Sequence, residues 1–163
     1  MHEEQDSHSL VDQDYILWAL IRQTEWVIFR AREVELALHD LTPEQAAVCF
    51  YINLIGNNPT PGELSRWMVR EPHTISGLLD RMKKKGLVRK DKDTERRNQV
   101  RVVLTEKGQQ AFDQGTKRES IHLIFSCLTE EEREQLKSIL TKLRDMTLEK
   151  FGLFKKPPFP PQE

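Results

Sequence analysis

Between residues 72 and 104 the spacing of the apolar residues changes from that of a helix to that of a strand. The first part has the i, i+3, i+4, i+7 spacing of one buried helical stripe, formed by Ile75, Leu78, Leu79 and Met82. Gly86 follows at a position that suits the left-handed end of a helix. Residues 87–92 and 99–104 then favour two strands, the second of which alternates apolar and polar side chains. This order predicts a helix followed by a β-hairpin, which is a wing.

Two helix starts precede this helix. Thr42-Pro43-Glu44-Gln45 and Thr60-Pro61-Gly62-Glu63 each place a threonine at the N-cap, a proline in the first turn and Gln or Glu where a capping box needs it. Only a short helix fits between the second start and Pro72. Short helices followed by a helix with an exposed outer face form the outline of a helix-turn-helix.

Long helices flank this unit. Residues 10–38 have apolar side chains on more than one face, so the helix needs cover from its own domain and from a partner subunit. One helix is expected from residue 105 to about residue 125, and another after the capping box that starts at Thr129. The predicted fold class is mainly α with a small β-hairpin wing. The predicted segments are a dimerisation helix (1–40), a winged helix-turn-helix (41–105), C-terminal dimerisation helices (106–151) and an extended proline-rich tail (152–163).

Charge is unevenly distributed along the chain. The formal net charge is −1, but residues 60–105 carry 12 Lys and Arg against 6 Asp and Glu, and the remainder carries 13 against 20. Such a separation indicates one basic binding face on an acidic body, as in proteins that bind nucleic acid.

The third helix of this unit has an outer face suited to the major groove of DNA. With Ile75 turned inward and about 100° per residue, the residues that point most directly outward are His73, Gly77, Asp80 and Lys84. Those that flank them are Thr74, Ser76 and Arg81. Gly77 allows close backbone approach, whereas Asp80 would be repelled by phosphates unless it pairs with Arg81 or Lys84 or accepts from cytosine. The alternative is an ordinary solvated helix face.

The hairpin extends the positive surface. Arg96 and Arg97 lie at its predicted tip, and its strands carry Arg89, Lys90, Lys92 and Arg101. Lysines at such a hairpin mainly contact phosphate, and an arginine at the tip suits the negative potential of a minor groove. The hairpin therefore favours DNA binding over a merely solvated helix.

Residues 41–109 resemble the MarR family of winged-helix regulators. The matching motifs are Leu41-Thr42-Pro43-Glu44-Gln45, Glu63-Leu64-Ser65, Pro72-His73-Thr74-Ile75-Ser76, Leu78-Leu79-Asp80-Arg81-Met82-Lys83-Lys84-Lys85-Gly86-Leu87-Val88 and Leu104-Thr105-Glu106-Lys107-Gly108. The resemblance implies a homodimer on a pseudo-palindromic site, with His73, Thr74, Ser76 and Gly77 on the recognition helix. It makes Arg97 the minor-groove arginine, although Glu95-Arg96-Arg97 replaces the family's Asp-x-Arg and leaves Arg96 as the alternative. Gly77 stands where the family often has an arginine.

The resemblance also implies a small aromatic or phenolic effector bound between the dimer helices and the DNA-binding lobe. Trp18, Trp26, His39 and Phe50 are the candidate ligand-binding residues, the alternative being that these aromatic side chains belong to the core. Cys49 and Cys127 form neither a disulfide framework nor a metal site, and we expect both to be buried and reduced rather than redox-sensing. The family's cysteine-sensing branch carries its cysteine near the N-terminus, where this chain has none.

Several classes of protein are disfavoured. No apolar run approaches the ~18 residues of a membrane span, and residues 1–9 are too acidic for a signal peptide, so we expect a cytoplasmic protein. The chain lacks a glycine-rich phosphate loop, a nucleophile elbow and metal-ligand spacing among its five histidines. We expect no enzyme activity, no metal and no cofactor. The predicted function is a DNA-binding transcriptional regulator, expected to be a repressor; the alternative is a winged-helix protein-interaction module.

Overall fold

The computed structural model describes residues 3–93, 99–115, 117 and 119–161, and it has the predicted mainly helical fold with one hairpin. The elements in chain order are α1 (Glu3–Ala37), α2 (Pro43–Ile55), α3 (Pro61–Met68), α4 (Pro72–Lys84), β1 (Val88–Lys92), β2 (Val100–Leu104), α5 (Glu106–Gly115), α6 (Glu119–Phe125) and α7 (Glu130–Phe151). The two strands pair antiparallel, with Val88 opposite Leu104 and Lys92 opposite Val100.

The predicted helix ends are present. Thr42, Thr60 and Thr129 each accept from the backbone N–H three residues later, and the Gln or Glu at that position accepts from the threonine N–H in return. Each box supplies partners for backbone groups that the first turn leaves unpaired. Gly86 follows α4 with a φ of +74°, the conformation that glycine adopts without strain.

The hydrophobic core lies between α2, α3, α4 and the hairpin. Its fully buried side chains include Val48, Leu64, Ile75, Leu79, Met82 and Val102. The end of α1 contributes Leu36, and α5 contributes Phe112. The backbone N–H of Val102 donates to the Pro59 carbonyl at 2.8 Å, which joins β2 to the segment before α3. The core therefore holds the helix-turn-helix and the hairpin together as one lobe.

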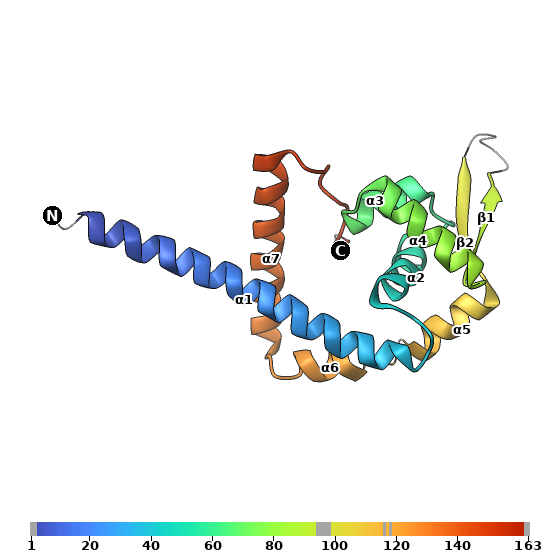
Figure 1. Cartoon of the computed structure of the whole chain (residues 1–163), viewed down its shortest axis with the longest axis horizontal. Helices are drawn as coiled ribbons and strands as arrows, with labels where there is room; N and C mark the ends of the chain where they lie inside the picture. Colours follow the sequence, from blue (N-terminus) through green and yellow to red (C-terminus); the bar gives the residue numbers. More distant parts are fainter. Residues whose placement is uncertain (1–2, 94–98, 116, 118, 162–163) are drawn as a thin grey trace.

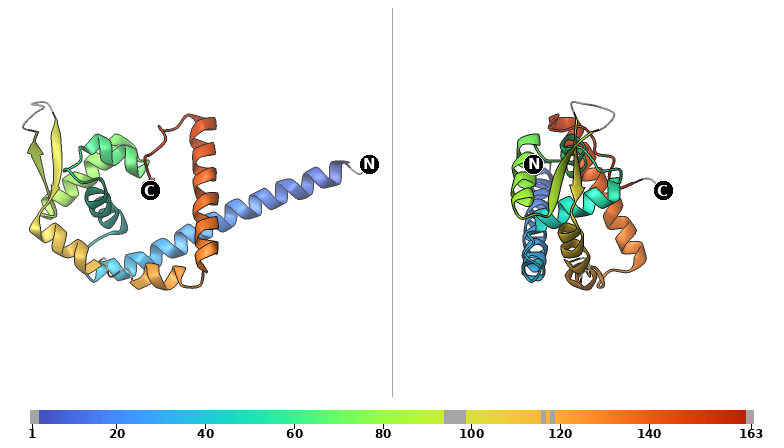
Figure 2. Two further views of the ribbon diagram at one scale, coloured as in Figure 1. Left: turned by 180° about the vertical axis from the view of Figure 1, so that it is seen from behind. Right: turned by 90° about the vertical axis from the view of Figure 1, so that its right-hand side faces the viewer.

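Outside this lobe, α1 and α7 have much of their apolar surface exposed to solvent. Figure 1 shows α1 running far beyond the lobe and α7 standing apart from the lobe, and the reverse view in Figure 2 shows the same arrangement. Large apolar side chains are exposed along residues 15–34 of α1 and 139–151 of α7, among them Trp18, Trp26, Leu140 and Leu143. No helix in the described part of the chain is both long and apolar enough to span a membrane.

Two sequence predictions are wrong. The single helix expected over residues 105–125 is two helices, because α5 ends at Gly115, a residue type of low helix propensity, and α6 begins at Glu119. Gly115 also packs closely on α1, since an added Cβ would lie 3.0 Å from Leu36 Cδ2. The Arg32 guanidinium donates to the Gly115 carbonyl at 2.9 Å and so satisfies a carbonyl at the helix end. Cys49 is buried as expected, but Cys127 is exposed because it lies in the turn between α6 and α7 rather than on a packed helix face.

Candidate nucleic-acid interface

The turn between α3 and α4 is fixed by its own hydrogen bonds. The Ser65 hydroxyl donates to the Arg70 carbonyl at 2.6 Å, and the Arg70 N–H donates to the Ser65 carbonyl at 3.1 Å. Val69, which ends α3, has a left-handed backbone with φ 51°. This sharp turn sets the direction in which α4 leaves the helix-turn-helix.

Helix α4 has one buried and one exposed side, as its sequence predicts. The buried side consists of Ile75, Leu78, Leu79 and Met82. The exposed side chains are those of His73, Thr74, Ser76, Asp80, Arg81 and Lys84, and Gly77 is partly exposed among them. These side chains offer hydrogen-bond donors, acceptors and positive charge along one helical face, which is the chemistry that reads base edges in a major groove.

Asp80 has a partner that the sequence analysis did not anticipate. Its carboxylate accepts from Lys90 Nζ at 2.7 Å, across the gap between α4 and β1, rather than from Arg81 or Lys84. The Lys90 hydrogen bond and charge hold the pKa of Asp80 below its usual range. The pair joins the exposed helix face to the hairpin and neutralises a carboxylate that would otherwise face phosphates.

The loop end of the hairpin ladder is anchored by Arg101 of β2. Its Nε donates to Asp93 at 2.7 Å, and its Nη1 donates to the Asn58 carbonyl at 3.5 Å, close to Glu63 at 3.6 Å. Arg89 likewise pairs with Asp91 at 2.9 Å. Part of the predicted positive surface therefore serves internal ion pairs. The predicted tip residues Arg96 and Arg97 lie outside the described residues.

A close approach of two backbones fixes the other end of the hairpin. A Cβ on Gly108 would lie 2.0 Å from the Leu87 carbonyl oxygen, so only glycine fits there. The Thr105 hydroxyl donates to the Gly86 carbonyl at 2.6 Å and accepts from the Gly108 N–H at 3.0 Å. These contacts hold α5 against the start of β1.

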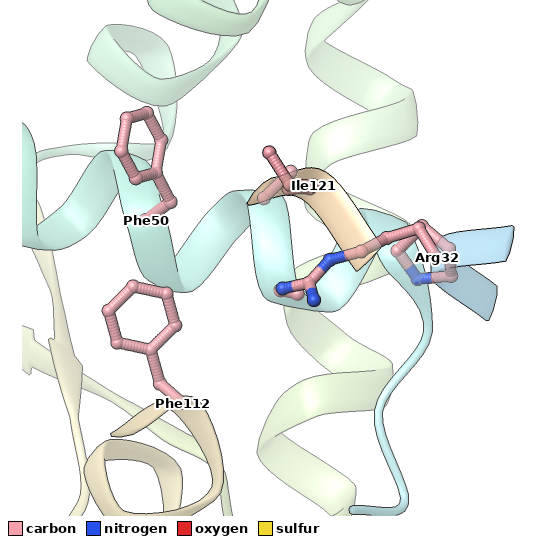
Figure 3. Close-up of a pocket in the computed structure, with 7 residues that line it drawn as sticks. Arg32, Phe50, Phe112 and Ile121 are labelled. Atoms are coloured by element: carbon pink, nitrogen blue, oxygen red, sulfur yellow. The ribbon is translucent and has the colours of Figure 1, made fainter. Parts of the chain in front are cut away.

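A cavity of about 310 Å³ lies between α1, α2, α5 and α6. Its lining is apolar apart from one guanidinium and consists of Arg32, Pro43, Ala46, Ala47, Phe50, Phe112 and Ile121. In the view of Figure 3, Phe50 and Phe112 lie on one side and Arg32 and Ile121 on the other. The volume of this cavity is at the small end of the range for ligand pockets. Its apolar lining and its single guanidinium suit a molecule with one ring and one polar group.

Arg32 is held in place by Glu35 on its own helix and by the Gly115 carbonyl at the end of α5. The Arg32 side chain is only 12% exposed and pairs with Glu35, which also accepts from the Ser120 hydroxyl. Burial raises the pKa of Glu35, but hydrogen bonds from Ser120 and Arg32 and the Arg32 charge outweigh burial and lower it. The guanidinium is thus a preorganised cation at the cavity wall.

The comparisons with known proteins agree with this geometry. A family model described as a winged helix DNA-binding domain matches residues 31–108. The solved structure of the organohalide-sensing transcriptional regulator RdhR, bound to 2,4-dichlorophenol, is 33% identical; the match covers 90% of this chain and 89% of that one, with a TM-score of 0.79.

The chain belongs to the MarR family. The DNA complex of MepR from S. aureus is 25% identical over 78% of this chain and 93% of that one, with a TM-score of 0.71. A MarR mutant from E. coli with operator DNA is 24% identical over 82% and 97%, with a TM-score of 0.73, and supports the fold. No curated protein matches the chain. As a member of the MarR family, it is a DNA-binding transcriptional regulator.

The predicted ligand residues of this MarR-family chain are not gathered in one place. Phe50 lines the cavity, His39 lies half-buried in the connection between α1 and α2, and Trp18 and Trp26 are 55% and 60% exposed on α1. Sequence reasoning missed Arg32, Phe112 and Ile121. Phe112 belongs to an apolar helical pattern, but nothing local distinguishes Arg32 from the other charged residues of α1.

Proposed function

We propose that this MarR-family regulator is a repressor that binds a pseudo-palindromic operator as a homodimer, with α4 in the major groove and the hairpin in the adjacent minor groove. The observation that carries this proposal is the polar, exposed face of α4 above a single buried stripe. His73, Thr74, Ser76 and Gly77 would meet base edges, and Arg81 and Lys84 would meet phosphates. Either Arg96 or Arg97 would enter the minor groove.

The exposed apolar side chains support the dimer. On α1 these include Leu17, Trp18 and Trp26, and on α7 Ile139, Leu140 and Leu143. Exposed apolar side chains in such number mark an interaction site, and a second copy of the chain has the same two helices with which to cover them. In this proposal residues 1–40 and 106–151 form the dimer, and residues 41–105 form each DNA-binding lobe. A regulator that meets the chromosome is expected in the cytoplasm.

The cavity supports a small acidic aromatic effector. Phe50 and Phe112 offer ring contacts, and Arg32 offers a cation for a phenolate or carboxylate. RdhR, a relative at 33% identity, was solved with 2,4-dichlorophenol. In our proposal His39 lies at the rim, and Trp18 and Trp26, exposed on α1, reach the ligand only across the dimer. Binding would draw Arg32 away from Glu35, which also accepts from Ser120 of α6, and so alter the contact between α1 and α6.

Binding measurements test the proposal. The protein is titrated with the duplex from upstream of its own gene and with a scrambled duplex of equal length, at several salt concentrations. We expect tighter binding to the natural duplex, a steep loss with salt, and release by 2,4-dichlorophenol. Equal and weak binding to both duplexes would instead favour a protein partner for the basic face.

A further inference from the structure

The C-terminal segment (residues 152–161) folds back on the molecule instead of leading away from it. It leaves α7 at Gly152, which has a φ of +61°, and contains no helix or strand among its described residues. Pro157 is buried, and Phe154, Phe159 and Pro160 are half-buried. Figure 2 shows the segment returning from the end of α7 toward the lobe that carries α3.

One side of the C-terminal segment is bound to α7. Arg144 Nη1 donates to the Phe159 carbonyl at 2.7 Å. Lys156 Nζ pairs with Asp145 Oδ2 at 2.7 Å, and Asp145 also pairs with Arg144. Two adjacent residues of α7 thus hold both ends of residues 156–159.

The other side of the C-terminal segment meets the DNA-binding lobe. The Phe159 ring packs edge-on against Phe50, with centroids 6.5 Å apart, and against Tyr51, at 5.6 Å. Tyr51 packs in turn against Trp67 of α3 at 6.4 Å. Leu153, Phe154 and Lys155 line a hollow together with residues of α3 and the start of α4, namely Gly62, Ser65, Arg66, Glu71 and Pro72.

These contacts bridge the two parts of the chain that must keep a fixed relation in DNA binding. Helix α7 belongs to the proposed dimer body, whereas Tyr51, Trp67 and Pro72 lie in the lobe that holds α4. Paired half-sites require recognition helices about 34 Å apart. If the lobe rotates about its connections to α1 and α5, only a fraction of its orientations have this spacing, and the affinity for DNA is reduced by that fraction. A brace, meaning a set of contacts that holds the lobe against α7, restricts the orientations of the lobe and so favours the spacing that DNA binding needs.

We infer that residues 153–161 brace the DNA-binding lobe against α7, with Phe159 as the positioning residue. The inference rests on the proposed dimer only for its effect on operator affinity; the brace itself is a property of one chain. Since Phe50 both contacts Phe159 and lines the cavity, the brace also meets the wall of the proposed effector site.

The test measures the lobe position within one chain. Spin labels are placed on the exposed native Cys127, in the α6–α7 turn, and on Lys83→Cys of α4, while buried Cys49 stays unlabelled. The labelled protein is diluted into unlabelled protein so that double electron–electron resonance reports only the distance inside a chain. We expect one narrow distance distribution, which broadens in Phe159→Ala and in Arg144→Gln. Phe151→Ala, the same chemical change at a side chain 73% exposed, is the control and stays narrow.

The second measurement is affinity, made on unlabelled protein with the duplex from upstream of its own gene. We expect Phe159→Ala to bind about tenfold more weakly, with Phe159→Leu recovering part of the loss, because two ring contacts are removed. The thermal midpoint should fall by no more than about 3 °C, since Phe159 lies outside the core and only its contacts with Phe50 and Tyr51 are lost. An unchanged distance distribution would overturn the inference. A broadened distribution with full affinity would refute the effect of the brace on operator binding. A monomer in sedimentation would instead refute the proposed dimer and leave the distance result to decide the brace.

Discussion

Replacing Gly77 by alanine should separate the stability of the fold from its ability to bind DNA. A Cβ at Gly77 would lie 3.7 Å from Arg81 Nη1, the mobile end of a long side chain, so the structure has room for it. Alanine is favoured over glycine inside a helix by roughly 1 kcal/mol. For a chain of 163 residues this gain raises the unfolding midpoint by about 3 °C. The same methyl group would stand between α4 and the base edges, so operator affinity should fall by about tenfold, or 1.4 kcal/mol.

Calorimetry and fluorescence anisotropy with the operator duplex measure the two effects. The matched control is Gly62→Ala on α3, where an added Cβ meets only Thr60 Oγ1 at 3.9 Å. That variant should keep full affinity. A Gly77→Ala protein that is more stable and binds DNA normally would refute the close approach of α4 to DNA. A Gly77→Ala protein that is less stable than the native protein would refute the inference that the structure has room for a Cβ at this position.

Three further predictions concern other parts of the chain. Gly108→Ala should lower the free energy of unfolding by about 2–3 kcal/mol, because its Cβ would overlap the Leu87 carbonyl, and urea denaturation measures this. Glu35→Gln should cost about 1 kcal/mol at pH 7. Since the folded protein lowers the pKa of Glu35, this cost should shrink as the pH falls through that pKa, and a cost that persists in acid would contradict the ionised pairing. With Ellman's reagent, one thiol per native chain should react, that of exposed Cys127, because burial raises the pKa of Cys49 to about 12; reaction of both would contradict the burial.

The features that follow local rules were predictable from the sequence. The capping boxes at Thr42, Thr60 and Thr129 each combine two side chains three residues apart, so they can be read directly along the chain. The stripe that starts at Ile75 fixes which face of α4 is buried, and thereby which face is exposed. Gly86 marks the end of that helix region because its backbone has positive φ.

Features that depend on contacts between distant segments were not predictable in this way. Gly115, at the end of α5, contacts Leu36 and Arg32, some eighty residues earlier, although the glycine itself was a signal that sequence reasoning did not use. The pairing of Asp80 with Lys90 depends on the position of β1 relative to α4. The cavity gathers side chains from four helices, and only Phe50 among its lining residues was anticipated.

The same distinction applies to the C-terminal segment. Its prolines indicate that it forms no helix, but composition gives no information about where it packs. Its position follows from the contacts of Phe159 with Phe50 and Tyr51, and from the hydrogen bond that Arg144 of α7 donates to the Phe159 carbonyl. Composition therefore predicted the backbone character of this segment and missed its contacts.

The most direct test of the account is a hydroxyl-radical footprint of the protein on the DNA upstream of its own gene. Two chains that each place α4 in a major groove should protect two patches related by a two-fold axis, with centres about 34 Å, or one helical turn, apart or a multiple of it. Minor-groove protection beside each patch would mark the two hairpins. No protection at protein concentrations that saturate binding, or a single patch without its symmetry mate, would contradict a dimer that reads a pseudo-palindromic operator.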